Sequence, residues 1–150
     1  MKKLVLYVLL LFAFVSCQEE VKFNNPSFQG LKDNIFWRAV ASKATLSNNI
    51  LTIEAYTRNE KVTLKTNSNN FETYPLGIDN LNTATYVIED AIPKITFKTG
   101  TNKGDGEIVI EKYDAVNNTV TGTFRFNAKN EIDGSAINFQ KGVFYNVPIN

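Results

Sequence analysis

The chain has 150 residues, of which 43% are hydrophobic and 12% aromatic, with 16 basic and 15 acidic side chains. This length and composition suit one domain with a packed core. The formal charge of +1 argues against the basic surface on which nucleic-acid binding depends. The sequence has no histidine and a single cysteine, which excludes histidine-based catalysis and an internal disulfide.

The beginning of the chain has the features of a secretory signal. Two lysines precede an unbroken apolar run over residues 4–15, and a serine stands directly before Cys17. The run is shorter than the roughly 20 residues that a membrane-spanning helix needs. A small residue followed by cysteine resembles a bacterial lipoprotein signal, although Phe14 stands where that signal more often has leucine. We therefore expect residues 1–16 to be a lipoprotein signal peptide and Cys17 to be acylated.

Two alternatives to acylation are a buried free thiol at Cys17 and a helical anchor that is never cleaved. An acylated cysteine would hold the protein on its membrane, because each buried acyl CH₂ contributes about 0.8 kcal/mol. Residues 17–30 then form the acylated cysteine and a polar tether. The acidic pair Glu19 and Glu20 looks like the export signal of surface-displayed Bacteroidetes lipoproteins, with a solvated linker as the alternative.

Residues 31–150 are expected to form a single antiparallel β-domain. Apolar side chains recur with a period of two, and breaks rich in Asn, Gly, Asp and Ser separate the runs. The clearest hairpin lies within residues 106–128 and turns at residues 114–118. The other predicted strands cover residues 36–44, 50–57, 61–66, 85–89, 95–99 and 136–147, with a less regular segment at 71–80.

Prolines and glycines indicate where the sheet is irregular. Pro75 and Pro93 cannot donate to a ladder, so this middle region is expected at a sheet edge or a crossover between sheets. The apolar phase shifts near Gly142, as a β-bulge would make it do. About eight such strands favour an antiparallel β-sandwich, with a calycin-like closed β-barrel as the alternative.

No motif of a known catalytic or nucleotide-binding site is present. Two carboxylates can cleave glycosidic bonds if the fold brings them together, but solubilising roles are favoured for the acidic candidates, which are Glu54, Glu72, Asp105, Glu107 and Glu111. Asn102, Asp105 and Glu107 alternate with glycines as calcium ligands can, yet a hairpin turn accounts for them better. We expect no catalytic residues, no cofactor and no metal.

Aromatic side chains are the remaining candidates, because ligand-binding proteins use exposed rings as platforms. The rings considered as ligand-facing are Trp37, Tyr56, Tyr74 and Tyr113. Packing in the core or at its rim is the competing role. Trp37 is out of phase with Phe36, and Tyr56 lies on the polar side of its predicted strand, so at least one of Trp37 and Tyr56 should be partly exposed.

Three stretches support a family resemblance: "FWRAVASKATLSNNILTIEAY", "GEIVIEKYDAVNNTVTGTFRFNA" and "GVFYNVPI". Together with the signal, they resemble a family of small Bacteroidetes lipoproteins known only as a domain of unknown function. The resemblance implies a secreted, lipid-anchored, all-β domain, and it brings no catalytic residues. Gly122 and Gly142 fit the pattern of that family.

The expected function is that of a lipid-anchored outer-membrane lipoprotein of the cell envelope, a binding or interaction module rather than an enzyme. Its expected partners are the membrane, through Cys17, and a glycan, a small hydrophobic ligand or an envelope protein, but no nucleic acid. Two alternatives stay open. One is a carrier of a small hydrophobic ligand in a barrel cavity, and the other is a carboxylate-dependent glycan-active enzyme.

Overall fold

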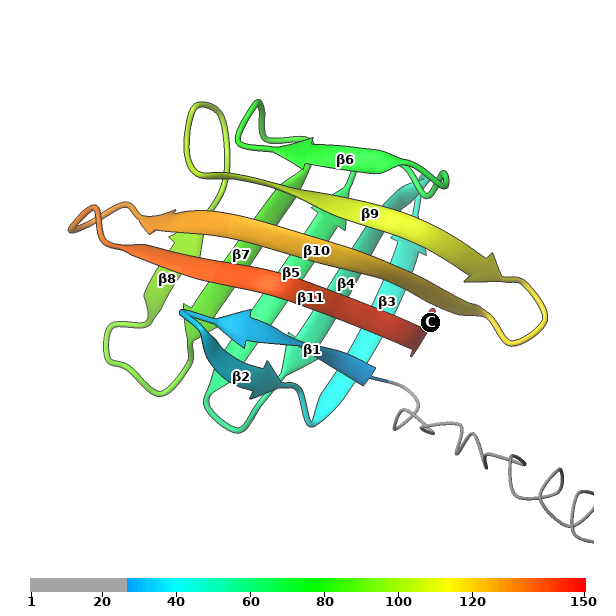
Figure 1. Ribbon diagram of the computed structural model, residues 1–150, viewed down its shortest axis with the longest axis horizontal. Coiled ribbons are helices and arrows are strands. Elements are labelled where there is room, and N and C mark those ends of the chain that lie inside the picture. The colour runs from blue at the N-terminus through cyan, green and yellow to red at the C-terminus, as the bar shows by residue number, and fades with distance from the viewer. Residues whose placement is uncertain (1–26) are drawn as a thin grey trace, which may run out of the picture.

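The computed structural model describes residues 27–150, which form one antiparallel sheet of eleven strands that curls on itself (Figure 1). This part of the chain contains no helix, and therefore none long and apolar enough to cross a membrane. The strands are β1 (Ser27–Lys32), β2 (Ile35–Arg38), β3 (Ala41–Ser47), β4 (Ile50–Tyr56), β5 (Glu60–Thr66), β6 (Thr73–Leu76), β7 (Thr83–Ile88), β8 (Ile95–Lys98), β9 (Asp105–Asp114), β10 (Thr119–Asn130) and β11 (Ala136–Pro148).

The curled sheet has two layers that cross (Figure 1). A back layer of β3, β4, β5, β7 and β8 lies behind a front layer of β1, β2, β6, β9, β10 and β11. The layers join where β10 pairs with β8 at Lys129 and Asn130. On the other side, a parallel bridge between Ala44 and Ile149 ties β3 to the end of the chain. The all-β antiparallel fold expected from the sequence is confirmed, and it has the form of a half-barrel.

The long hairpin and the bulge lie where the sequence predicts them. β9 and β10 pair from Asp105 opposite Asn127 to Asp114 opposite Thr119. On the other side of β10, Phe124 faces Gly142 and Phe126 faces Phe139, so β11 carries one extra residue between these pairs. Lys141, which lies between these pairs, has a φ of 52°, and this left-handed conformation accommodates the extra residue. The predicted β-bulge is thereby confirmed.

The beginning of the domain corrects two predictions. Residues 27–30 are not part of the tether, because they begin β1 and pair with β11. Residues 36–44 are not one strand, because the chain changes layers in the middle. The Ala39 amide donates to Phe28 in the front layer, and the next amide, Val40, donates to Tyr56 in the back layer. The predicted strand is therefore two strands, β2 and β3, in different layers.

Prolines lie at irregular places in the sheet, as expected. Pro75 is in β6, which pairs only with β9 and so forms an edge of the front layer. Pro93 precedes β8, the strand that connects the two layers. Because proline lacks an amide hydrogen, an edge or a connection is where it disturbs the fewest ladder bonds.

The core lies between the two layers and is rich in aromatic rings. Phe28, Phe124, Phe126 and Phe139 are almost fully buried and form neighbouring pairs with ring centroids 4.7 to 6.2 Å apart. Tyr86 of the back layer packs against Phe139 at 5.8 Å. Rings at these separations contact one another and occupy the space between the layers.

Two glycines make room for this packing. On β10 and β11, Gly122 lies opposite Phe144, and Phe124 lies opposite Gly142. Each phenylalanine ring covers the glycine across from it. A Cβ added to Gly122 would collide with the carbonyl oxygen of Val109 and the ring of Phe144. The spacing of glycine and phenylalanine in "GTF" and "GVF" is thus a packing requirement.

We predict that Gly122→Ala lowers the free energy of unfolding by at least about 2 kcal/mol, because the new methyl group overpacks both a ring and the backbone of β9. Urea denaturation of the purified protein measures this. Thr123→Ala is the matched control, since Thr123 is the half-buried next residue on the opposite side of β10. Equal stability losses in the two variants would contradict the packing role of Gly122.

Candidate functional site

The four aromatic residues considered as ligand-facing lie in different parts of the structure. Trp37 and Tyr74 are buried, with exposed fractions of 5% and 2%, so neither offers a ring to solvent. Tyr56 and Tyr113 are half-buried at the surface, on β4 and at the end of β9. The four residues therefore do not form one platform.

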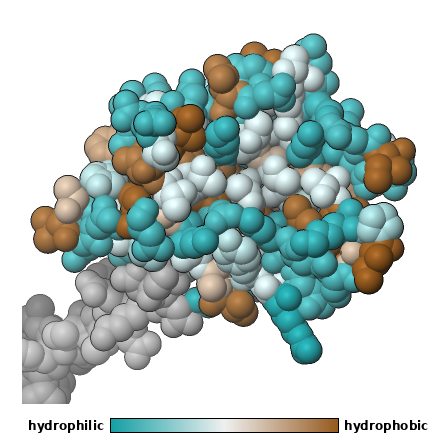
Figure 2. All heavy atoms as spheres, turned by 180° about the vertical axis from the view of Figure 1, so that it is seen from behind, coloured by the Kyte–Doolittle hydropathy of each residue, from teal (hydrophilic) through white to brown (hydrophobic). Residues whose placement is uncertain are grey.

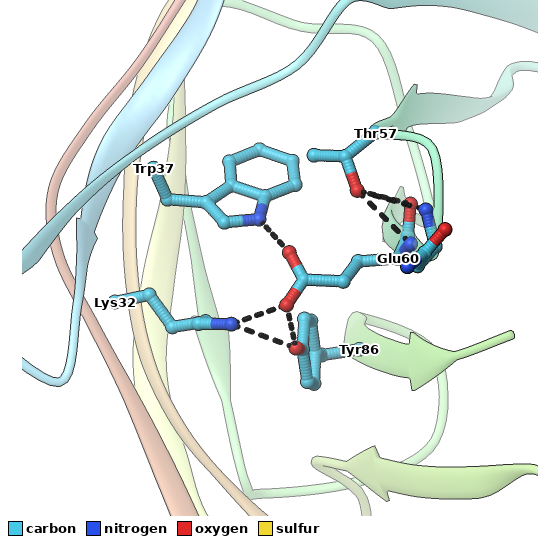
Figure 3. A network of polar contacts seen from close by, with 6 residues as sticks. Lys32, Trp37, Thr57, Glu60 and Tyr86 are labelled. Carbon is cyan, nitrogen blue, oxygen red and sulfur yellow. Dashed lines mark hydrogen bonds and ion pairs between the residues drawn. The ribbon is translucent and has the colours of Figure 1, made fainter. Parts of the chain in front are cut away.

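Trp37 belongs to a polar network that links four strands (Figure 3). Its indole Nε1 donates to Glu60 Oε2, and Lys32 Nζ donates to Glu60 Oε1. The hydroxyl of Tyr86 also donates to Glu60 Oε1, at 2.5 Å, and accepts a bond from Lys32 Nζ at 2.9 Å. These side chains come from β1, β2, β5 and β7, so the network joins the edge of the front layer to the back layer.

The charges of the network are set by burial and by hydrogen bonds. Burial alone would raise the pKa of Glu60, but the hydrogen bonds from Lys32, Tyr86 and Trp37 outweigh it and lower that pKa. Burial, together with the neighbouring Glu60 carboxylate, raises the pKa of Tyr86 far above its usual range. Because each polar group of the network already has a partner in the chain, we assign it a structural role.

Tyr56 lies on the outer face of the back layer, which Figure 2 shows as mainly hydrophilic and intermediate in hydropathy. The amino groups of Lys61 and Lys43 lie 5.4 and 6.0 Å from the centre of its ring. Both lysines also form ion pairs with Glu54, and the hydrogen bond from Lys61 lowers the pKa of Glu54. The polar groups around Tyr56 are therefore paired with one another.

Three hollows on the surface of residues 27–150 offer room for a ligand. The first, of about 390 Å³, lies over the bulge of β11, where Arg125 Nε already donates to Glu107 Oε1 at 3.1 Å. The second, of about 170 Å³, contains Lys98, which forms an ion pair with Glu131 at 3.1 Å. In each of these two hollows, the chain itself pairs a cation with a carboxylate of the lining.

The third hollow, also of about 170 Å³, differs in its lining. Asn69, Asn70 and Phe71 form one wall, in the connection between β5 and β6, and Tyr113 of β9 forms the other. Phe71 is 65% exposed. We call this the Phe71–Tyr113 hollow. It contains one of the four predicted rings, Tyr113, while another, Tyr74, lies in β6 and donates its hydroxyl to the carbonyl of Asn70 at 2.9 Å.

Three of the acidic candidates, Asp105, Glu107 and Glu111, lie along β9. Asp105 accepts a hydrogen bond from Asn127 at 2.7 Å, and Glu107 is paired with Arg125. Within residues 27–150, no group of three or more acidic or cysteine side chains is arranged to hold a metal ion. The predicted signal peptide and Cys17 lie outside the described residues, so their assignment stays a prediction.

Fold and surface define an all-β domain with a ring-filled interior and small hollows on its outside. The chain belongs to the DUF6252 family, a domain of unknown function whose family model matches residues 24–148. The resemblance indicated by the sequence is thereby confirmed at the level of this domain. No curated protein and no solved structure matches the chain.

Sequence reasoning missed both the Glu60 network and Phe71. Glu60 follows a polar turn and gives no local sign of the three donors that reach it from distant strands. Phe71 did give a signal, because it is a single aromatic residue within the polar stretch "NSNNFE". A ring at such a position has no strand alternation to place it in the core.

We predict that Glu60→Gln lowers the free energy of unfolding at pH 7 by about 1 to 3 kcal/mol, since it weakens charged hydrogen bonds in a partly buried site. Urea denaturation gives the value. Glu111→Gln is the matched control, because Glu111 is exposed on β9.

The effect of Glu60→Gln is also expected to depend on pH. The folded-state pKa of Glu60 lies below its ordinary value of 4.5, so the ionised group stabilises the fold above that pH, and the contribution is lost as the pH falls through the folded pKa. The stability difference between wild type and variant should therefore narrow below about pH 4.5. A difference that stays constant down to pH 3 would contradict the charge argument.

Proposed function

We propose that this protein is a lipid-anchored, non-catalytic binding module of the cell envelope that contacts its ligand with its outer surface. We choose the outer surface because aromatic rings in mutual contact fill the space between the two layers. A binding protein built in this way has its recognition groups on the outside.

The anchoring part of the proposal is supported by the sequence. The basic start, the apolar run, and the serine before Cys17 are the features of a bacterial lipoprotein signal. We propose acylation of Cys17, a location in the outer membrane and an origin in the Bacteroidetes. Residues 18–26 then connect the anchor to β1, which begins at Ser27.

The ring-filled interior supports external binding over the carrier alternative. A carrier needs an apolar cavity of a few hundred Å³ for its ligand, and Phe124, Phe126 and Phe139 pack together in the place where it would lie. For the enzyme alternative, a general acid needs a raised carboxyl pKa. The hydrogen bonds described above lower the pKa values of both Glu54 and Glu60.

We predict that the protein from the membrane fraction of its native host has an intact mass corresponding to a chain that begins at Cys17 and carries acyl groups. Cys17→Ser removes the nucleophilic sulfur, so this variant should keep residues 1–16 and lack acyl groups. Asn24→Ala, which lies beyond the signal, should be processed as wild type is. A wild-type chain with its leader attached and a free thiol would contradict the anchor.

A second prediction separates external binding from ligand transport. Organic extraction of the protein from its native membrane, followed by mass spectrometry, should release no apolar molecule in a stoichiometric amount, because rings fill the interior. A carrier would release about one ligand per chain. The acyl groups on Cys17 remain with the protein in this experiment, since they are covalently bound.

A further inference from the structure

The Phe71–Tyr113 hollow places two aromatic residues and two asparagines together at the surface. A single exposed hydrophobic side chain is ordinary on a protein surface. Here, however, an exposed ring lies beside a second ring and two amides in one concave site. Core packing accounts for part of the Tyr113 ring, which packs against the core, but not for Phe71, which is 65% exposed.

The wall that contains Phe71 is held in place by a series of hydrogen bonds. The buried Thr66 donates its hydroxyl to the carbonyl of Ser68 at 2.7 Å, and the amide of Asn67 donates to Asn82 at 2.9 Å. The hydroxyl of Tyr74 lies 3.0 Å from that of Ser68 and donates to the carbonyl of Asn70. The connection is therefore fixed from below by buried residues, which lowers the entropy cost of binding.

The opposite wall is fixed as well. Tyr113 lies near the end of β9, and its hydroxyl donates to Asn118 Oδ1 at 3.0 Å. Asn118 in turn donates its side-chain amide to the carbonyl of Ile149, near the end of the chain. The ring of Tyr113 is thus oriented through its hydroxyl, while the hollow is lined from both sides.

The side-chain amides of Asn69 and Asn70 are available for a ligand. Within residues 27–150 neither amide forms a hydrogen bond to another group of the chain. Each amide offers two donor hydrogens and an acceptor oxygen. Together with Phe71 and Tyr113, they make a lining without formal charge that has both apolar faces and free hydrogen-bonding groups.

We propose that the Phe71–Tyr113 hollow binds one sugar ring of a neutral glycan. The C–H face of a pyranose packs on aromatic rings, and its hydroxyl groups pair with planar amides that both donate and accept. The volume of about 170 Å³ is well below that of a drug-sized pocket, so it suits a single ring. This inference rests on the proposed function, since it assumes that the ligand is bound on the outside.

The lining also decides against other ligands. An acidic sugar or a phosphate would require a cation, and the four lining residues carry none. A purely apolar ligand would leave the two amides without partners, which is unfavourable once water is excluded. The other two hollows lack this combination, because charged side chains line both of them, among them the pairs Arg125–Glu107 and Lys98–Glu131.

The test is binding of the full chain, solubilised in a detergent without sugar groups, to an array of neutral and acidic oligosaccharides, followed by titration calorimetry. We expect a neutral oligosaccharide to bind with a dissociation constant on the order of 0.1 to 1 mM. Phe71→Ala should weaken binding about tenfold or more, and the double variant Asn69→Ala/Asn70→Ala should weaken it by a similar factor. Both variants should keep wild-type thermal stability.

Ile78→Ala is the matched control, because Ile78 is 64% exposed in a different connection. Its affinity should equal that of wild type. The proposal is overturned if no neutral glycan binds up to about 10 mM, or if only acidic glycans or an apolar dye bind. It is also overturned if Phe71→Ala binds as tightly as Ile78→Ala. A failure here would leave the acylation and extraction results unchanged, so the two proposals fail separately.

Discussion

The partly buried carboxylate of Glu60 is the constraint on which the arrangement of the two layers depends. A charge withdrawn from water is costly unless donors replace the lost hydration. Here the donors are Lys32 and Trp37 from the front layer and Tyr86 from the back layer. All three reach Glu60, on β5, from β1, β2 and β7, so their bonds hold the two layers together. β2 has four residues and pairs only with β1 in the sheet, so its contact through Trp37 also fixes this edge against β5.

The two glycine–phenylalanine pairs of β10 and β11 make room for large rings in the front layer of the core. Gly122 and Gly142 each face a phenylalanine across the β10–β11 pair, and each ring occupies the space that a Cβ atom on the opposite glycine would need. Phe28 of β1 then packs on Phe124 at 4.7 Å. Glycine usually weakens a strand because it has no side chain to pack. In this sheet the opposite ring compensates for that loss, and the core becomes continuous from β1 to β10.

The alternation of apolar and polar residues made most of the strands predictable from the sequence. The features that the sequence did not predict depend on contacts between distant parts of the chain. β4, β5 and the β9–β10 hairpin alternate clearly between buried and wet positions, and they lie in the structure as expected. The division between β2 and β3 was missed because Ala39 and Val40 bond to different layers, which no local pattern records. For the aromatic candidates, too, the local pattern does not show which side of a strand faces the core. Alternation indicated that Phe36 and Trp37 face opposite sides, but only the fold shows that Trp37 is inside and Phe36, 63% exposed, is outside.

A ring-filled interior restricts binding to shallow sites, and a shallow site for one sugar ring gives a weak interaction by itself. Anchoring to a membrane raises the overall strength with which many weak sites bind together. On a membrane, as we propose for this protein, many copies face the same glycan layer, and each further contact forms at a high effective concentration. Weak individual contacts then add up to lasting attachment, provided that every copy presents a preformed site. The hydrogen bonds that fix Asn70 through Tyr74 and orient Tyr113 through Asn118 give the hollow this property.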